Sequence, residues 1–321
     1  MSERDQRRLI ALLERKLGLQ WSDITEWLRS VNGLEEIERR LVTGQFPIVG
    51  VEEAARRLAD EIHGAYVTSG KTQAEWLDRQ ERTKDTLVRF DTGQALVVAR
   101  QRESEIKTVA GLSAESRDVI RGVLVEGRQA GTNPRQMATR IRDSIGLTAQ
   151  QEQWAENYRR ALEQQDYSRA QGYELSSGNA DRSVASAQRR GVGLAPERIS
   201  EMVEQYRANA LTYRAETIAR TEAQGAAEAG ATDAIDQAVS RGDVRAEELL
   251  VEWHAGPASL NARVDHQEMD GVTVKFGEDF TLPDGTQMSG PHDPRGGAKH
   301  NANCRCTKST RIDLDRVSYA A

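Results

Sequence analysis

Two cysteines separated by one residue lie near the C-terminal end, in the run Cys304-Arg305-Cys306. On a β-strand, residues i and i+2 project from the same face, so two thiolates in this arrangement can bind one metal ion together. A disulfide between them would close a strained ring. His300 precedes Cys304 by four residues and is a candidate third ligand, and His266 is a candidate fourth. Because Cys₂His₂ is an ordinary ligand set of structural zinc, the sequence predicts a zinc site here.

Two alternatives to this ligand set stay open. His292 is a possible substitute for one of the other histidines. The C-x-C spacing is also shorter than the C-x₂₋₄-C of most zinc fingers, so two free, partly buried cysteines beside loop histidines are the competing interpretation. In either case the potential metal ligands are concentrated at this end, since four of the 5 histidines and both cysteines follow residue 250, together with four of the 7 prolines.

The same residues also partly match two motifs of metal-dependent enzymes. His266-Gln267-Glu268 imitates the H-x-E of zinc deaminases, but Asn303 precedes Cys304 where those enzymes need Pro, and the cysteine gap is one residue short. Asp265 and His266 with a later Asn and His resemble a His-Asn-His nuclease finger, which places a base and a metal beside a phosphate. A metal-dependent nuclease is therefore the alternative function. The chain contains no P-loop, G-x-S-x-G elbow or dinucleotide fingerprint.

The composition narrows the class of protein. The 321 residues are 38% hydrophobic, 5% aromatic and 29% charged, with a mean hydropathy of -0.66. Such a chain favours slender helices with narrow apolar stripes, and some apolar surface completed by a partner. The net charge of -6 argues against a protein that coats nucleic acid. With no apolar run of about 18 residues and no signal-peptide pattern, we expect no membrane span and synthesis in the cytoplasm.

The elements that position the candidate ligands follow from periodicity. Helical spacing dominates two ranges, 1–110 and 111–242, and the range 243–321 alternates apolar and polar residues like strands over 249–255, 272–276 and 305–312. We therefore predict a mostly α protein: an N-terminal helical region, a middle helical region, and a small α+β module with the His/Cys cluster.

Helix boundaries can also be predicted. Pro134 after Thr132 and Asn133 predicts a helix start, and Pro196 opens the longest helical pattern. Breaks are predicted at Gly18, Thr68–Gly70, Asp91–Gly93 and Leu112–Ser116. Within the longest pattern, small residues allow a second backbone to approach closely; they are Gly225, Ala226, Ala227, Ala229 and Gly230.

In order along the chain, several motifs together resemble those of the phage head morphogenesis (minor head) protein family, which includes the F protein of phage Mu. The motifs are Ile218-Ala219-Arg220-Thr221-Glu222, then Trp253, then Arg263-Val264-Asp265-His266-Gln267-Glu268-Met269-Asp270-Gly271, then Pro291-His292-Asp293-Pro294, then Asn303-Cys304-Arg305-Cys306. The resemblance covers roughly residues 115–310. Asn261 stands where the family usually has Asp.

The resemblance implies a low-copy virion component that is bound near the portal vertex and needed for head assembly. It implies the portal protein, the major capsid or scaffolding protein, and the packaged DNA as partners, with the head interior or portal vertex as location after assembly in the host cytoplasm. It implies no catalytic activity for the shared region. Residues 1–110 resemble no family that we can name.

Overall fold

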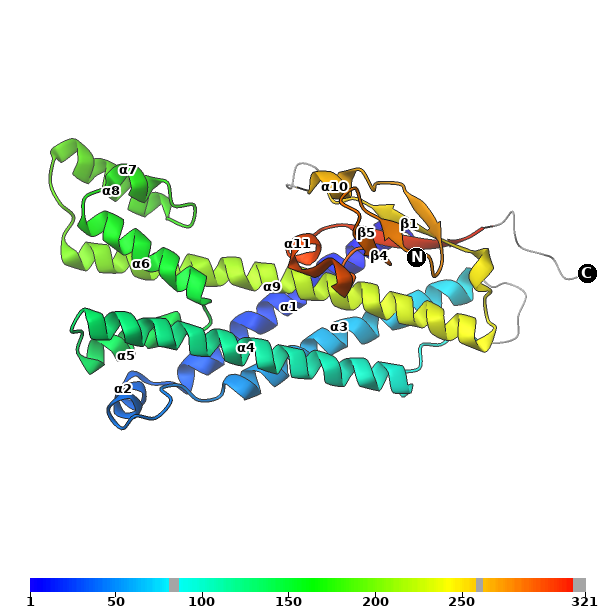
Figure 1. The fold of residues 1–321 in the computed structure, drawn as a ribbon, viewed down its shortest axis with the longest axis horizontal. Coiled ribbons are helices and arrows are strands. Elements are labelled where there is room, and N and C mark those ends of the chain that lie inside the picture. Colours follow the sequence, from blue (N-terminus) through cyan, green and yellow to red (C-terminus); the bar gives the residue numbers. More distant parts are fainter. Residues whose placement is uncertain (81–86, 258–261, 314–321) are drawn as a thin grey trace, which may run out of the picture. The chain divides into compact units, whose positions relative to one another are not determined.

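The computed structural model describes residues 1–80, 87–257 and 262–313, and its fold is mostly helical with a small strand-containing region near the C-terminal end (Figure 1). This confirms the predicted fold class. The helices, in chain order, are α1 (Glu3–Ser30), α2 (Leu34–Val42), α3 (Val51–Gln80), α4 (Ala95–Gln129), α5 (Pro134–Ser144), α6 (Ala149–Glu163), α7 (Tyr167–Gln171), α8 (Gly178–Arg190), α9 (Pro196–Arg241), α10 (Val264–Gln267) and α11 (Gly297–Asn301).

The helix starts follow local capping chemistry. Asn133 accepts a hydrogen bond from the backbone N–H of Gln136 and Pro134 occupies the first turn of α5, as predicted. Thr148 begins α6 with a capping box, in which its side chain and that of Gln151 bond each other's backbone N–H. Pro196 begins α9, which at 46 residues is the longest described helix.

Of these predicted helix breaks, the one at Asp91–Gly93 is confirmed, because it lies between α3 and α4, and the other three are wrong. The helix α1 continues through Gly18, α3 through Gly70, and α4 through Ser116. The Ser116 hydroxyl donates to the carbonyl of Leu112 inside α4, so the polar side chain is satisfied without ending the helix. At Gly70 an added Cβ would lie 2.6 Å from the Phe90 ring, which shows that this glycine serves close packing instead of termination.

The strands form two small antiparallel sheets. In the larger sheet the central strand β1 (Leu249–His254) pairs with β2 (Thr273–Lys275) on one side and with β5 (Thr307–Ile312) on the other. In the smaller sheet β3 (Phe280–Thr281) pairs with β4 (Gln287–Met288). Alternate residues of β1 are buried, which agrees with the alternation in the sequence. Among its described residues the region also contains the 3₁₀ turns η1 (Ala246–Glu248) and η3 (Pro294–Gly296).

The chain divides into two compact units that do not follow the three sequence ranges. Unit 1 contains residues 1–20, 59–105 and 216–321, and unit 2 contains residues 21–58 and 106–215. The difference arises because single helices, among them α1 and α9, contribute residues to both units. The strands and every candidate ligand belong to unit 1.

Unit 2 is held by an aromatic core and a buried ion pair. The rings of Tyr158 and Tyr206 stack with centroids 4.9 Å apart, and Tyr173 packs edge-on against both. The guanidinium of Arg207 donates to the carboxylate of Glu152 at 2.7 Å, and each side chain is only 6% exposed. Burial favours the neutral carboxyl, but the hydrogen bonds from Arg207 and Arg140 outweigh it and hold the pKa of Glu152 below its ordinary value.

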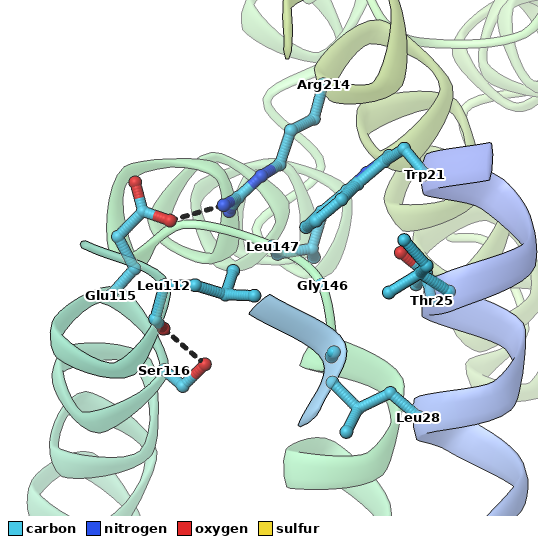
Figure 2. A pocket seen from close by; sticks show the side chains of 11 residues that line it. Trp21, Thr25, Leu28, Leu112, Glu115, Ser116, Gly146, Leu147 and Arg214 are labelled. Atoms are coloured by element: carbon cyan, nitrogen blue, oxygen red, sulfur yellow. Dashed lines mark hydrogen bonds and ion pairs between the residues drawn. The ribbon is translucent and has the colours of Figure 1, made fainter. Parts of the chain in front are cut away.

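A small hollow in unit 2 is lined by Trp21 of α1, Glu115 of α4 and Arg214 of α9, among others (Figure 2). Arg214 pairs with Glu115 and lies over the Trp21 ring at 5.3 Å from its centroid. The cavity volume is about 10 Å³, which is the space of about one water molecule and leaves no room for a ligand. A search of the described helices finds none that is long and apolar enough to cross a membrane.

Candidate metal centre

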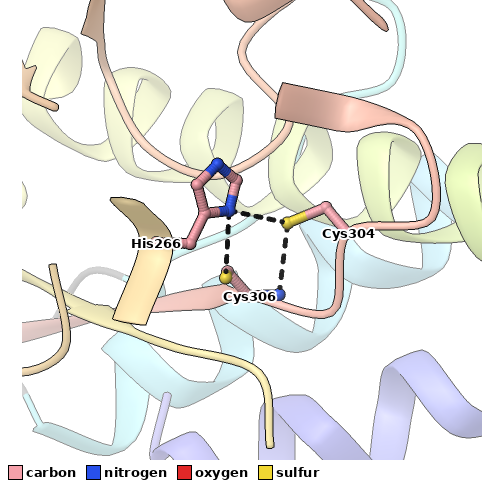
Figure 3. Close-up of side chains that lie close together, drawn as sticks. All are labelled: His266, Cys304 and Cys306. Carbon is pink, nitrogen blue, oxygen red and sulfur yellow. Dashed lines mark hydrogen bonds between the residues drawn. The ribbon is translucent and has the colours of Figure 1, made fainter. Parts of the chain in front are cut away.

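The structure brings His266, Cys304 and Cys306 together in one buried cluster (Figure 3). His266 lies on α10, Cys304 follows α11, and Cys306 directly precedes β5. The Nδ1 atom of His266 is 3.4 Å from the Cys304 Sγ and 3.4 Å from the Cys306 Sγ. The histidine is 1% exposed and each cysteine 2%. Residues that are 38 and 40 positions apart are thus placed with their donor atoms facing one another.

The donor atoms fit a tetrahedral metal ion. With Zn–S near 2.3 Å and Zn–N near 2.0–2.1 Å, the nitrogen-to-sulfur edge of a tetrahedron is roughly 3.6 Å. The observed separations of 3.4 Å are close to that edge. All three donor atoms lie within 4.8 Å of one another. The cluster could therefore hold a metal ion, with one imidazole and two thiolates as ligands.

Local hydrogen bonds prepare the sulfur atoms for this role. The backbone N–H of Gly256 donates to the Cys306 Sγ at 3.4 Å, and the N–H of Cys306 donates to the Cys304 Sγ at 3.4 Å. The hydrogen bond shared by the two thiols lowers the pKa of Cys306 to about 5 and raises the pKa of Cys304. One thiolate is thus favoured at neutral pH, and thiolates are the form that binds metal.

His300 is not placed as a ligand of the same ion, which corrects the predicted ligand set. Its ring stacks on His266, and its Nδ1 lies 3.1 Å from the Nε2 of His266, on the side away from the sulfurs. Its own Nε2 lies 3.1 Å from an Asp284 oxygen. With a metal at the Nδ1 of His266, Nε2 would carry the proton and donate it to His300, which would donate to Asp284. Such outer partners fix the orientation of a ligating imidazole.

His292, the predicted substitute ligand, lies outside the cluster. Its Nε2 is 2.6 Å from the Oε1 of Gln224 on α9, and its backbone has a φ of 64°. Burial lowers the pKa of His292 to about 4, so its ring is neutral at pH 7. The ring therefore fastens the loop before η3 to α9.

A second group of possible ligands consists of Asp265, Asp284 and His300, whose donor atoms also lie within 4.8 Å of one another. Lys299 forms an ion pair with the Asp284 carboxylate. The ammonium group therefore already neutralises the oxygen that a cation would need. Asp284 was not predicted as a site residue, because in the sequence it is one residue of an ordinary Pro-Asp-Gly turn.

The cluster is enclosed by apolar side chains of the strands. Trp253 is fully buried and meets the His266 ring edge-on at 5.5 Å between centroids, and Phe280 packs on the other side of the indole at 5.4 Å. Met288 is also fully buried here. This shell excludes water from the sulfurs, which explains why Trp253 belongs to the same motif set as the cysteines.

The remaining motif residues connect the cluster to its surroundings. On α9, Arg220 donates to the Asn303 Oδ1 at 2.7 Å, and the Thr221 hydroxyl accepts from the Asn303 backbone N–H at 3.2 Å. Glu222 follows on the same helix and is half-buried. Within the strand region, Arg263 donates to the carbonyl of Ala302 at 2.7 Å.

Asp270 and Gly271 form the turn between α10 and β2. An Asp270 oxygen accepts from the Ala255 backbone N–H at 2.8 Å, and Gly271, at a φ of 77°, donates to the Trp253 carbonyl at 2.8 Å. A left-handed backbone of this kind favours glycine, which has no Cβ, and this explains why a glycine occupies position 271. Asn261, the departure from the family pattern, lies outside the residues that the structure describes.

No protein-family model matches the chain, and no match is found among curated proteins or solved structures. The resemblance to the head morphogenesis family therefore depends on the motifs in the sequence.

Proposed function

We propose that this protein is a minor head protein of a tailed phage, a structural component that binds near the portal and supports capsid assembly and the packaging or delivery of DNA. Its partners would be the portal protein and the major capsid or scaffolding protein, with packaged DNA as a further contact. Its location would be the head interior or the portal vertex of the virion.

One observation carries this proposal. Motif residues that are more than 80 positions apart in the sequence are in direct contact, since Arg220 and Thr221 both bond Asn303. Trp253, His266 and the two cysteines then pack against one another at the same place. A set of motifs that arose by chance would have no reason to meet in three dimensions. Their convergence supports the view that they form one structural unit, as the resemblance implies.

The nuclease alternative has less support. A general base needs a ring nitrogen that can reach a substrate or its water. His266 is 1% exposed, its Nδ1 faces the two sulfurs and its Nε2 faces His300. Both nitrogens are engaged inside the protein, so His266 is better suited to hold the fold together than to take a proton from a water that attacks a phosphate.

The assembly role is tested by co-expressing the chain with the portal protein of the same genome, followed by pull-down and native mass spectrometry. We expect a complex of defined stoichiometry. A soluble monomer that binds neither portal nor capsid protein would contradict the proposal. DNA cleavage by the purified chain that disappears with His266→Ala, while the far-ultraviolet circular dichroism is unchanged, would favour the nuclease instead.

We also propose that the metal of the cluster is zinc, with His266, Cys304 and Cys306 as ligands. The ion would connect α10 to the start of β5 and so fix the small C-terminal region, because metal binding free energy becomes folding free energy. Elemental analysis of anaerobically purified protein should find about one zinc per chain, and Cys304→Ser or Cys306→Ser should abolish it. The matched control is His254→Ala, since His254 bonds Ser309 at the end of β1 and does not reach the cluster.

A substitution of His300 tests whether this residue is an outer partner of His266 or a ligand of the metal. As an outer partner of His266, it should affect affinity without being needed for stoichiometry, so His300→Ala should weaken zinc binding about 10–100-fold in a competition assay. Loss of the whole site with His300→Ala, with His266 and the cysteines intact, would show that His300 is itself a ligand. Absence of any metal in the unmodified protein would remove the zinc proposal.

A further inference from the structure

Unit 1 contains a second hollow that is separate from the metal centre. Its volume is about 210 Å³, and it is lined by residues of α1, α3 and α9 and of the strand region. A cavity of about 150 Å³ is enough to bind benzene. Sites for drug-sized ligands occupy about 300–1,000 Å³. The hollow is therefore of a size for a small organic molecule and too small for a nucleotide.

Three buried polar atoms at this cavity have no hydrogen-bond partner among the described residues. They are the Oε1 of Gln6, the Nε2 of Gln73 and the Oε2 of Glu228. These side chains are only 3%, 3% and 4% exposed. Gln6 also donates through its Nε2 to the other Glu228 oxygen at 2.7 Å, so the pair is fixed with one oxygen of each side chain left over. Since buried polar groups are almost always satisfied, the two free oxygens indicate a ligand that donates hydrogen bonds, whereas the Gln73 Nε2 is itself a donor and plays no part in that argument.

The charges at the cavity favour a cation. Three carboxylates line it, those of Glu228, Asp236 and Glu278, against the single ammonium of Lys308. That ammonium also donates to the Ser289 carbonyl at 3.3 Å. Burial raises the pKa of Glu228 to about 7, because nothing in the site fully compensates its negative charge. A bound cation would provide that compensation.

The cavity also has apolar walls. Ile235, Val251, Phe276 and Ala231 line it beside the polar groups. A bare metal ion would gain nothing from these side chains, because hard cations take oxygen ligands on all sides. An aliphatic stem, in contrast, would bury apolar surface against them.

We propose that this cavity binds a small organic cation, a primary amine or guanidinium group on a short aliphatic stem. The cationic N–H groups donate to the free oxygens of Gln6 and Glu228, and the stem packs between Ile235, Val251 and Phe276. This site is independent of the proposed phage function and of the metal. The same chemistry is available from a free amine and from a lysine or arginine side chain of a partner protein.

The test is isothermal titration calorimetry on the full-length chain as purified. The probes are 1,4-diaminobutane and 4-guanidinobutylamine for the free cation, and Nα-acetyl-lysine amide and Nα-acetyl-arginine amide for a partner's side chain. The neutral 1,4-butanediol and the anionic succinate are controls of similar length. We expect at least one cation to bind at least tenfold more tightly than the diol, and the better of the two probe pairs identifies the source.

Variants locate the binding in the cavity. Glu228→Gln preserves the shape and removes the charge, and should weaken binding of the cation about tenfold or more. Ala231→Leu fills the cavity and should abolish binding without removing a polar group. The matched control is Glu61→Gln, because Glu61 of α3 pairs with Lys16 away from the cavity and should leave affinity unchanged.

Gln6→Leu keeps the test decisive if Glu228→Gln does not fold. It removes the free Oε1 acceptor of Gln6, which the cationic N–H groups use, so binding of the cation should weaken about tenfold or more. Gln73→Leu is its matched control, because it removes an unpartnered donor that a cation cannot use; it should raise the midpoint of thermal unfolding of the ligand-free chain without weakening binding. If no cation binds better than 1,4-butanediol, or if binding survives both Glu228→Gln and Ala231→Leu, water alone fills the cavity and the proposal is wrong.

Discussion

At the scale of single residues, Glu228 illustrates how burial changes acid–base behaviour. Its carboxyl is enclosed by Gln6 and by the backbone N–H of Lys308, which donates to it at 3.3 Å. Burial raises its pKa to about 7, from an ordinary value of 4.5, and the positive charge of Lys308 only partly opposes this. The folded chain therefore holds this proton at pH values where the unfolded chain has released it.

The consequence is a defined pH dependence of stability. Because the pKa is higher in the folded state, the contribution of Glu228 is fully present below pH 4.5 and is lost as the pH rises to about 7. We expect Glu228→Gln to remove this loss and to stabilise the chain at pH 8 by on the order of 3 kcal/mol. Urea unfolding at pH 5 and pH 8 measures it, with Glu61→Gln as the control. Equal pH dependence in both variants would contradict the buried carboxyl.

The left-handed backbone of Asn303 leads to a prediction about strain. Its φ of 55° lies in the left-handed region, and its side chain accepts from Arg220. In Asn303→Gly the left-handed backbone is unstrained, and the loss is that of the side-chain hydrogen bond from Arg220. Asn303→Ala loses the bond and adds about 1–2 kcal/mol of strain. Chemical unfolding should therefore rank the native chain first, the glycine variant second and the alanine variant last; an alanine variant as stable as the glycine variant would argue against a strained position.

At the scale of elements, two glycines of α9 differ in what they do. The sequence predicted that small residues here allow a second backbone to approach. At Gly230 an added Cβ would lie 2.1 Å from the carbonyl oxygen of Tyr66 on α3, so this glycine is required for the helix contact. At Gly225 nothing lies within 4 Å, so the same prediction does not apply there.

These two positions give a matched pair of variants. Gly230→Ala should destabilise the chain by about 1–3 kcal/mol or more, because the backbone of α3 cannot move aside as a side chain could. Gly225→Ala should stabilise it by about 0.5–1 kcal/mol, since alanine loses less entropy in a helix. Thermal and urea unfolding of both variants test the assignment, and a Gly230→Ala variant as stable as the native chain would show that α9 and α3 are not in contact through Gly230.

At the scale of the whole molecule, the two compact units have different sources of stability. Unit 2 contains the buried pair of Arg207 and Glu152, and unit 1 contains the cluster of His266, Cys304 and Cys306. Arg207→Met would leave a buried carboxylate with part of its compensation removed, and we expect a loss of about 3–5 kcal/mol. Arg121→Met is the control, because Arg121 and Asp118 form an exposed pair, with 75% and 58% of their side chains accessible, worth about 0–1 kcal/mol.

Metal content reports on unit 1 in this experiment, whereas the substitution lies in unit 2. Because the cluster lies wholly in unit 1, Arg207→Met should lower the stability of the chain while the folded protein retains the same zinc per chain as the unmodified protein. Elemental analysis of the folded fraction checks this. Loss of zinc with Arg207→Met under conditions where the protein remains folded would contradict the division.

The sequence by itself determined the elements that depend on local chemistry. The start of α5 at Pro134, the start of α9 at Pro196 and the buried alternation of β1 follow from capping, fixed φ and side-chain period, which act over a few residues. Only tertiary packing decided whether the helices end at Gly18 and Gly70, because a glycine ends a helix or fits a close contact according to its neighbours in space. The C-x-C pair and His266 could likewise be nominated from the sequence. Which ring nitrogen of His266 faces the sulfurs, and hence that His300 bonds the other nitrogen, depends on how α10 and α11 pack, and no spacing in the chain encodes that.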